Sequence, residues 1–259
     1  MIKILVTGSN GQLGKTLKEL ALGLENLSFY FKTSKELDIT RVDQLLDTFE
    51  KEQYDFCINC AAYTNVEEAE KFPDLANQVN AEGVKNLAEV CKKQQTSLIH
   101  ISTDYVFDGK KEGGYTVEDK TNPINVYGKS KLAGEKFIQQ IQPNHYIIRT
   151  SWLYSKKYGH NFYLTILRKA SEGTELRITD QQIGCPTDTI TLARFILDEI
   201  VIAGDKPFGL YHVTDGRPMT WFDFAKKILE DNRLTEKAEL VLDRNYRTFA
   251  ARPKNSVLI

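Results

Sequence analysis

Short runs of branched and aromatic residues alternate with longer segments of helical periodicity along the first part of the chain. The strand-like runs read IKILVTG, LSFYFKT, FCINCAA, SLIHIST and YIIRTSW, and the helical patterns cover about 13–24, 42–51, 73–93 and 126–140. A regular strand-helix-strand order is typical of parallel sheets with helices on both faces. The pattern therefore predicts an α/β fold with a doubly wound, Rossmann-type parallel sheet.

Beyond Trp152 the pattern changes, because helical segments outnumber strands. Helices are predicted at about 162–171, 189–200 and 221–231, and short strands at 176–178 and 210–213. This part contains no glycine-rich nucleotide turn of its own. We expect residues 1–150 to form an NAD(P)-binding Rossmann domain and 151–259 to form mainly a smaller substrate-binding subdomain, part of which can return to the first domain.

Composition and charge exclude several classes of protein. Of the 259 residues, 41% are hydrophobic, and 34 basic residues nearly cancel 35 acidic ones. Such a chain is neither disordered nor basic enough to collect nucleic acid. No apolar run approaches the ~20 residues of a membrane helix, and the chain opens on a strand-like run instead of a signal peptide. We expect a cytoplasmic protein with no membrane partner.

The segment ILVTGSNGQLG places three glycines between the first strand and the first turn of a helix. A dinucleotide pyrophosphate binds backbone N–H groups at such a helix N-terminus, and glycine lets the backbone approach it closely. The spacing is G-x-x-G-x-x-G, so the position after the first strand carries the inference more than the spacing does. The residues expected at the cofactor are Gly8, Asn10, Gly11, Gln12, Leu13 and Gly14.

The end of the second strand predicts which dinucleotide is bound. An acidic residue about 20 residues beyond the glycines commonly holds the ribose of NAD. Here no carboxylate occurs before Glu36, whereas Lys32, Ser34 and Lys35 offer positive charge and a hydroxyl to the 2′-phosphate of NADP. We expect NADPH, with Lys32 and Ser34 among its ligands, and leave use of NADH open.

Cys57 and Cys60 form a C-x-x-C pair, which in some proteins marks a redox or zinc site. The pair lies in a run that reads as a buried strand followed by a turn of small residues. No second C-x-x-C and no H-x-x-x-H accompanies it. We therefore expect no metal and no redox role for these thiols.

Tyr127 and Lys131 form a Y-x-x-x-K pattern at the start of a predicted helix, one turn apart on one face. A free phenol, with a pKa of about 10, is a poor acid and a scarce base at neutral pH, and a nearby ammonium stabilises its phenolate. Thr103 follows the strand LIHIS, at the edge of the sheet where ligands bind. We predict that Thr103 binds the substrate oxygen, Tyr127 exchanges its proton, and Lys131 supports the tyrosine and binds the nicotinamide ribose.

A series of blocks extends this constellation over most of the chain. They read TGSNGQLG, LDIT, INCAAYTNVEEAE, VNAEGVKNLA, ISTDYVFDG, NPINVYGKSKLAGE, IIRTSWLY, GHNF, DQQIGCPT and AARPKNSVL. With them the chain resembles the extended short-chain dehydrogenase/reductase superfamily, and within it the dTDP-4-dehydrorhamnose reductase family. The resemblance implies NADPH-dependent reduction of the C4 ketone of dTDP-4-dehydro-L-rhamnose to dTDP-L-rhamnose, in deoxysugar biosynthesis.

The resemblance also implies further site residues. Those around the cofactor are Asp38, Ile39, Ala61, Ala62 and Tyr63, besides Tyr127 and Lys131. Those around the nucleotide-sugar substrate are Thr64, Val66, Asp104, Tyr105 and Trp152. Trp152 either packs on the sugar or fills the core, since both roles suit an aromatic residue at that position.

Other activities remain open at this point. Related dehydratases carry a glutamate where this chain has Tyr105, which argues against water elimination. A reductase of another nucleotide 4-keto-6-deoxysugar fits the same residues. A non-catalytic NADP-binding regulatory subunit, similar to that of methionine adenosyltransferase, is a second alternative, although Thr103, Tyr127 and Lys131 argue for catalysis.

Two features differ from the family. Its members continue past the ARP…SVL block with a further helix, whereas this sequence ends at Ile259. Lys15 and Thr16 stand where some relatives carry an acidic residue that holds a bridging magnesium ion. We therefore expect no magnesium-bridged dimer, and a monomer or a homodimer as the assembly.

Overall fold

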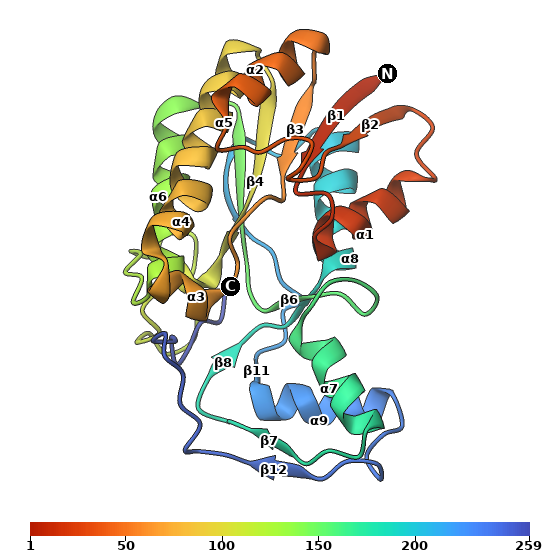
Figure 1. The fold of residues 1–259 in the computed structure, drawn as a ribbon, viewed down its shortest axis with the longest axis vertical. Coiled ribbons are helices and arrows are strands. Elements are labelled where there is room, and N and C mark those ends of the chain that lie inside the picture. Colours follow the sequence, from red (N-terminus) through yellow and green to blue (C-terminus); the bar gives the residue numbers. More distant parts are fainter.

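The computed structural model describes residues 1–259, and its centre is a six-stranded sheet (Figure 1). The strands are β1 Ile2–Thr7, β2 Leu27–Phe31, β3 Phe56–Asn59, β4 Ser97–Thr103, β5 His145–Thr150 and β10 Gly209–His212. Their order across the sheet is β10-β5-β4-β3-β1-β2, and every neighbouring pair is parallel. The chain reverses its direction of travel across the sheet at β1, and ligands bind outside the carboxyl ends of the strands at such a point. The predicted Rossmann-type α/β fold is confirmed.

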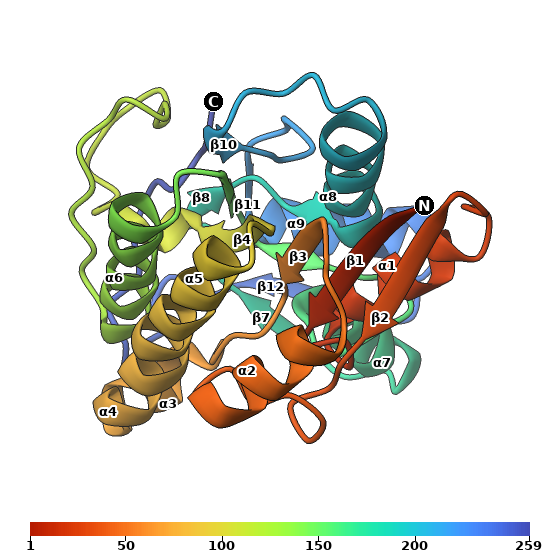
Figure 2. The same ribbon diagram turned by 90° about the horizontal axis from the view of Figure 1, so that it is seen from above.

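Helices cover both faces of this sheet (Figure 2). They are α1 Gln12–Ala21, α2 Val42–Lys51, α3 Val66–Lys71, α4 Pro73–Asn77, α5 Gly83–Lys93, α6 Val126–Ile141 and α8 Thr189–Arg194. Three further segments are the π-helical η1 Gln78–Glu82 and η3 Phe195–Ile202 and the 3₁₀ turn η2 Asp104–Val106. No helix has both the length and the hydrophobicity needed to cross a membrane.

The hydrophobic core lies in two layers, one on each face of the sheet, because side chains alternate along each strand. In β1, Ile4 and Val6 pack with α1, α8 and η3, whereas Leu5 packs with α2, α5 and α6. Strand β10, far along the chain, pairs with β5. The segment after residue 151 thus contributes one strand and one long helical segment to the central sheet layer.

The helix predicted at 73–93 consists of α4, η1 and α5 in succession, and α3 precedes it. The π-helical turn η1 places Asn80, which is fully buried, between the segment that follows β3 and helix α6. Its amide nitrogen donates to Tyr63 O (2.9 Å) and Ser130 Oγ (3.0 Å). π-Helical turns often occur where a side chain has to be aimed in this way.

The remaining elements gather beyond the carboxyl ends of the sheet strands (Figure 1). They are α7 Phe162–Ser171, α9 Trp221–Asp231 and the short strands β6 Leu153–Tyr154, β7 Leu176–Ile178, β8 Ile183–Gly184, β9 Thr187–Asp188, β11 Met219–Thr220 and β12 Leu240–Leu242. A separate hydrophobic cluster built on α7 and α9 fills their interior. Helix α9 begins with a capping box, in which Thr220 and Asp223 satisfy each other's backbone N–H groups.

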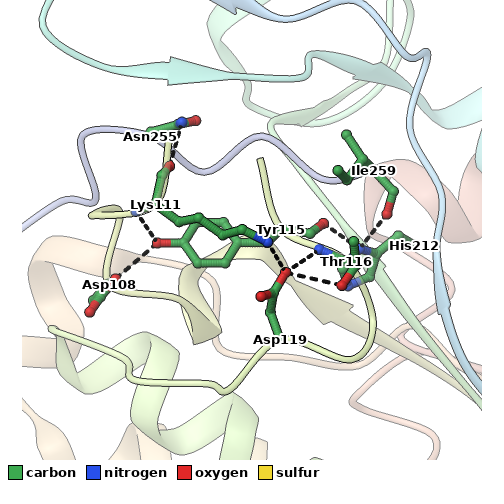
Figure 3. Close-up of polar contacts among 8 residues, drawn as sticks. All are labelled: Asp108, Lys111, Tyr115, Thr116, Asp119, His212, Asn255 and Ile259. Atoms are coloured by element: carbon green, nitrogen blue, oxygen red, sulfur yellow. Dashed lines mark hydrogen bonds and ion pairs between the residues drawn. The ribbon is translucent and has the colours of Figure 1, made fainter. Parts of the chain in front are cut away.

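The last residues of the chain return to the loop that precedes α6 (Figure 3). Tyr115 N–H donates to Val257 O (2.8 Å), and Ile259 N–H donates to Tyr115 O (2.9 Å). The ring nitrogen Nδ1 of His212, in β10, lies 3.1 Å from Tyr115 O and 3.2 Å from Ile259 O. These contacts join the loop and the C-terminal segment to the edge strand of the sheet.

Candidate active site

A cleft of about 820 Å³ lies between the carboxyl ends of the sheet strands and the elements built around α7 and α9, called the smaller unit below. All the residues that the sequence predicts for the site line this cleft except Lys32 and Lys35. The predicted lining residues are Gly8, Asn10, Gly11, Gln12, Leu13, Gly14, Ser34, Asp38, Ile39, Ala61, Ala62, Tyr63, Thr64, Val66, Thr103, Asp104, Tyr105, Tyr127, Lys131 and Trp152. The structure thus brings together residues from widely separated parts of the chain.

The glycine turn after β1 is shaped to hold a phosphate group. Gly8 has a φ of +62°, and a Cβ there would lie 2.6 Å from Ala61 N. A Cβ on Gly14 would lie 2.6 Å from Ser9 Cα, so helix α1 packs directly on the turn. The helix N-cap is Gly11, which supplies no side-chain cap for the first N–H groups. The uncapped N–H groups and the helix dipole fit a dinucleotide pyrophosphate.

The residues after β2 have the polarity expected next to a 2′-phosphate. The Glu36 carboxylate accepts hydrogen bonds from Thr33 N and Thr33 Oγ1, both at 2.8 Å, so it is held in its own turn. Ser34 lines the cleft, while the Lys32 backbone ties β2 to β1 and to the glycine turn. The Asp38 carboxylate is also engaged, with Thr40 N and Oγ1.

Tyr127 reaches the cleft because α6 packs unusually close to η2. The helix starts at Asn125, whose side chain accepts the Gly128 N–H (2.7 Å). A Cβ on Gly128 would lie only 2.1 Å from Tyr105 O, so glycine is required at this contact. Burial raises the pKa of Tyr127, and a hydrogen bond with Thr103 opposes that rise. Tyr127 is therefore a protonated acid beside the Thr103 hydroxyl at neutral pH.

Lys131 is buried, with 2% of its surface exposed. Its Nζ donates to Ile101 O (2.7 Å) and lies 3.3 Å from His100 Nε2. Burial lowers the pKa of Lys131 to about 8, while the charge of Glu135 acts in the opposite direction. This lysine can therefore gain and lose a proton near neutral pH.

Asp104 is buried beside Thr103, and burial raises its pKa to about 6. Its carboxylate oxygens accept hydrogen bonds from Thr103 Oγ1 (3.0 Å) and Ser151 Oγ (2.9 Å), which favour the ionised form and limit the rise. At neutral pH this buried carboxylate is charged, and its two hydroxyl partners offset only part of the desolvation penalty. Its burial therefore lowers the stability of the fold.

The raised pKa of Asp104 implies that the free energy of unfolding depends on pH. Since the pKa of Asp104 in the folded protein lies above the ordinary value of about 3.9 for an aspartic acid, folding favours the protonated acid, and that stabilisation is lost as pH rises through about 6. Asp104→Asn abolishes the titration. We expect the stability of the variant relative to the parent to improve by about 2 kcal/mol between pH 4 and pH 7. Urea unfolding at the two pH values measures it, and an equal difference at both would contradict it.

Two tryptophans join the two halves of the cleft. The rings of Trp152 and Trp221 stack with centroids 3.5 Å apart and planes at 3°. Trp152 has a φ of +47°, and Gly184 lies so close under its ring that a Cβ would approach to 2.5 Å. Trp152 follows β5 and Trp221 opens α9, so the stack connects the sheet with the smaller unit. Aromatic faces of this kind suit contact with sugars and bases.

Several lining residues were not predicted from the sequence, among them Asn59, His160, Trp221 and Arg252. The Arg252 guanidinium donates to Tyr105 Oη (3.1 Å) and Glu67 Oε1 (2.7 Å), and its buried Nε has no partner. The block AARPKNSVL contains Arg252, and that was the available signal for it. Asn59 and His160 likewise stand in the blocks INCAAYTNVEEAE and GHNF, whereas no block, periodicity or spacing relates Trp221 to the cleft.

The cysteines do not form a reactive pair. Contact with Cys91 and burial raise the pKa of Cys57, and burial raises the pKa of Cys60. Both thiols are therefore poor nucleophiles at neutral pH. All four cysteines are free, and no three His, Cys, Asp or Glu side chains converge in a way that could hold a metal ion.

The sequence is similar over its whole length to proteins of one family. A family model described as the RmlD substrate binding domain matches residues 2–259. A dTDP-4-dehydrorhamnose reductase from Aggregatibacter actinomycetemcomitans is 37% identical over 267 residues, covering 100% of this chain and 90% of the relative. The protein of that name from Escherichia coli (strain K12) is 37% identical over 267 residues, covering 99% of this chain and 89% of the relative.

Solved structures agree with the fold in detail. A dTDP-4-dehydrorhamnose reductase from Bacillus anthracis str. Ames, in complex with NADP, matches with a TM-score of 0.93 and 39% identity, covering 100% of this chain and 91% of that one. UDP-glucose 4-epimerase from Thermus thermophilus, in complex with NAD, matches with a TM-score of 0.81 at 19% identity, covering 100% and 90%. The second match concerns the fold alone.

Proposed function

The chain belongs to the RmlD substrate binding domain family, and from this premise we propose that it is an NADPH-dependent reductase of dTDP-4-dehydro-L-rhamnose. It reduces the C4 ketone of that sugar and yields dTDP-L-rhamnose. The observation that carries this is the placement of Thr103, Tyr127 and Lys131 in the cleft that the glycine turn also lines. A phosphate cradle and a tyrosine acid facing one cavity suit reduction of a carbonyl.

In the mechanism we propose, NADPH supplies the hydride when it is bound at the glycine turn. Thr103, whose single hydroxyl hydrogen points to Asp104 in the free protein, turns that hydrogen to the ketone oxygen and orients the carbonyl. Tyr127, protonated because burial raises its pKa, transfers its phenolic proton to the same oxygen as negative charge develops there. Lys131, whose pKa burial lowers to about 8, stabilises the phenolate that remains.

We propose that the two ends of the cleft divide the ligands between them. The glycine turn, with Asp38, Ile39 and residues 61–63, holds the cofactor from the sheet side. Thr64, Val66, Asp104, Tyr105 and Trp152 contact the nucleotide sugar. Residues 1–150 then act as the NAD(P)-binding domain and 151–259 mainly as the substrate-binding part. The Trp152–Trp221 stack supports the second assignment because both rings belong to 151–259 and line the cleft.

Recognition of the 2′-phosphate is tested by removing charge. Lys32→Ala/Lys35→Ala is expected to raise the KM for NADPH by about tenfold or more and to change the KM for NADH little, since each charge-assisted hydrogen bond contributes about 1.5–3 kcal/mol. Lys92→Ala/Lys93→Ala, at the far end of α5, removes the same charge away from the cleft and serves as the control. Equal effects on both cofactors would show that neither lysine reads the phosphate.

The activity itself is tested with dTDP-4-keto-6-deoxyglucose, the 3,5-epimerase and NADPH. Oxidation of NADPH is followed by absorbance, and the sugar product is identified by NMR. We expect dTDP-L-rhamnose. Oxidation with a different 4-keto-6-deoxysugar only would move the proposal to that substrate. NADPH binding without turnover of any keto sugar would refute a catalytic role and favour a regulatory subunit.

We further infer that the protein works in the cytoplasm, as a monomer or a homodimer. Support for the compartment comes from its four free cysteines, which suit a reducing environment. The near-neutral net charge of −1 supports a small-molecule substrate in preference to nucleic acid.

A further inference from the structure

His100 lies beneath the cleft on β4, with no exposed surface, and joins Lys131 to the neighbouring strand. One ring nitrogen, Nδ1, lies 3.0 Å from Asn59 Nδ2, and the other, Nε2, lies 3.3 Å from Lys131 Nζ. The proposed mechanism assigns no role to this ring. Its two contacts determine which nitrogen carries the hydrogen, and therefore what it offers to the lysine.

The orientation of Asn59 is determined by its other partners. Its side-chain oxygen accepts hydrogen bonds from Thr7 Oγ1 (2.6 Å) and from the backbone N–H of Ala61 (3.2 Å). A backbone N–H can only donate, so the oxygen of the amide points there and the nitrogen points to His100. An amide nitrogen can also only donate. His100 Nδ1 must therefore accept, and the hydrogen of the neutral ring is on Nε2.

This tautomer presents an N–H group to Lys131. An ammonium has donors only, so it cannot accept that hydrogen, whereas a neutral amine has a lone pair that can. A second proton on the ring would place two donors against each other at Asn59, and burial together with the charge of Lys131 lowers the pKa of His100. The ring therefore stays neutral and keeps its orientation.

Other titratable groups near Lys131 act in different directions. Glu135, on the same helix, favours the ammonium by its charge, while burial favours the amine. Cys60, after β3, is an uncharged thiol at neutral pH because burial raises its pKa. The Glu135 carboxylate is itself paired with Arg149. Among the groups that face Lys131, His100 is the one whose hydrogen-bonding geometry selects a protonation state directly.

We propose that His100 is a positioning residue, which directs its Nε2–H at the Lys131 nitrogen and so stabilises the neutral amine that Lys131 becomes when it gives up a proton. The line of donors runs from Asn59 to His100 to Lys131. The purpose of this arrangement rests on the proposed function. After Tyr127 has given its proton to the substrate, Lys131 as ammonium returns one to the phenolate, and a hydronium ion from solvent then protonates the amine. One solvent proton is consumed per turnover, as reduction of a ketone by NADPH requires. His100 keeps its own proton throughout.

The tautomer is measured by ¹⁵N NMR of histidine-labelled protein without substrate or cofactor. The chain has four histidines, and loss of one signal set in His100→Gln identifies His100. We expect a pyridine-type Nδ1 and a pyrrole-type Nε2 from mildly acidic to alkaline pH. A proton on Nδ1 in any part of this range would overturn the proposal. This measurement requires no turnover, so its failure is distinguishable from failure of the proposed reductase activity.

The effect on Lys131 is measured by reversing the line of donors. In Asn59→Asp the carboxylate accepts from Nδ1–H, which leaves Nε2 as an acceptor for the ammonium. The titration of Lys131, read from its ¹³Cε signal in lysine-labelled protein, is expected to move up by about one pH unit or more. The alkaline limb of the kcat profile is expected to move with it.

The control is Gln142→Glu, which introduces the same change of amide to acid at a buried site near the start of β4, where Gln142 donates to Thr96 O. It is expected to leave the Lys131 titration and the kcat profile in place. Equal titrations of Lys131 in Asn59→Asp and in the parent would overturn the proposal. A shift of the same size in both variants would do so as well.

Discussion

Replacing Tyr127 by phenylalanine is expected to lower kcat by about 10²–10⁴-fold and to leave the affinity for NADPH nearly unchanged. The hydroxyl is the acid that the proposed mechanism uses. The phenyl ring still fills the space beside Tyr105, whose ring lies edge-on at 5.9 Å. Steady-state rates and a fluorescence titration with NADPH measure the two quantities separately.

The matched control is Tyr146→Phe. This tyrosine is also buried, and its hydroxyl donates to Lys206 O (3.1 Å) near the amino ends of β5 and β10, away from the cleft. The same loss of a hydroxyl there is expected to leave kcat unchanged. Near-normal turnover by Tyr127→Phe would remove the tyrosine from the mechanism, whereas a fall in both variants would indicate a general loss of structure.

The largest effect on stability is expected at the buried ion pair of Glu135 and Arg149. Glu135 Oε2 lies 2.6 Å from Arg149 Nη2, and both side chains are nearly inaccessible to solvent. Ser102 also donates to this carboxylate, and the guanidinium lies over the Phe107 ring at 5.2 Å. Glu135→Leu leaves the arginine charge buried without its partner. We expect a loss of about 3–5 kcal/mol in the free energy of unfolding, measured with urea.

Two further variants test the physical reason. In Glu135→Leu/Arg149→Leu no charge is left unpaired, and most of the lost stability should return, because apolar side chains often replace a buried pair at little cost. Glu172→Leu breaks the exposed pair with Arg168, which is expected to contribute about 1 kcal/mol or less. A double variant as unstable as Glu135→Leu would show that the unpaired charge is not the cause.

The carboxyl edge of the sheet holds several groups that are costly to bury. Lys131, Asp104 and His100 are all less than 3% exposed. For each of them burial opposes the charged form. Such groups commonly mark functional sites, where stability is lower than the fold could otherwise reach.

Local sequence patterns determined the central strands, the glycine turn and the pairing of Tyr127 with Lys131. Each of these depends on spacing within a few residues: alternation of side chains in a strand, a turn that tolerates no Cβ, and one helical turn from i to i+4. The helices at 162–171 and 221–231 followed from periodicity in the same way and agree with α7 and α9. Ser34 and Thr103 needed only their position after a strand.

Tertiary structure alone decided which distant residues meet. Strand β10 joins the central sheet by pairing with β5, and Trp221 stacks on Trp152, although nothing in the local sequence relates these partners. The Lys32 side chain is absent from the cleft lining that Ser34 joins, and since both residues follow the end of β2, no strand alternation along the sequence distinguishes them. Which ring nitrogen of His100 carries the hydrogen depends on the side-chain amide of Asn59. The backbone N–H of Ala61, after β3, orients that amide. Contacts between elements determine such features, and no periodicity along one element encodes them.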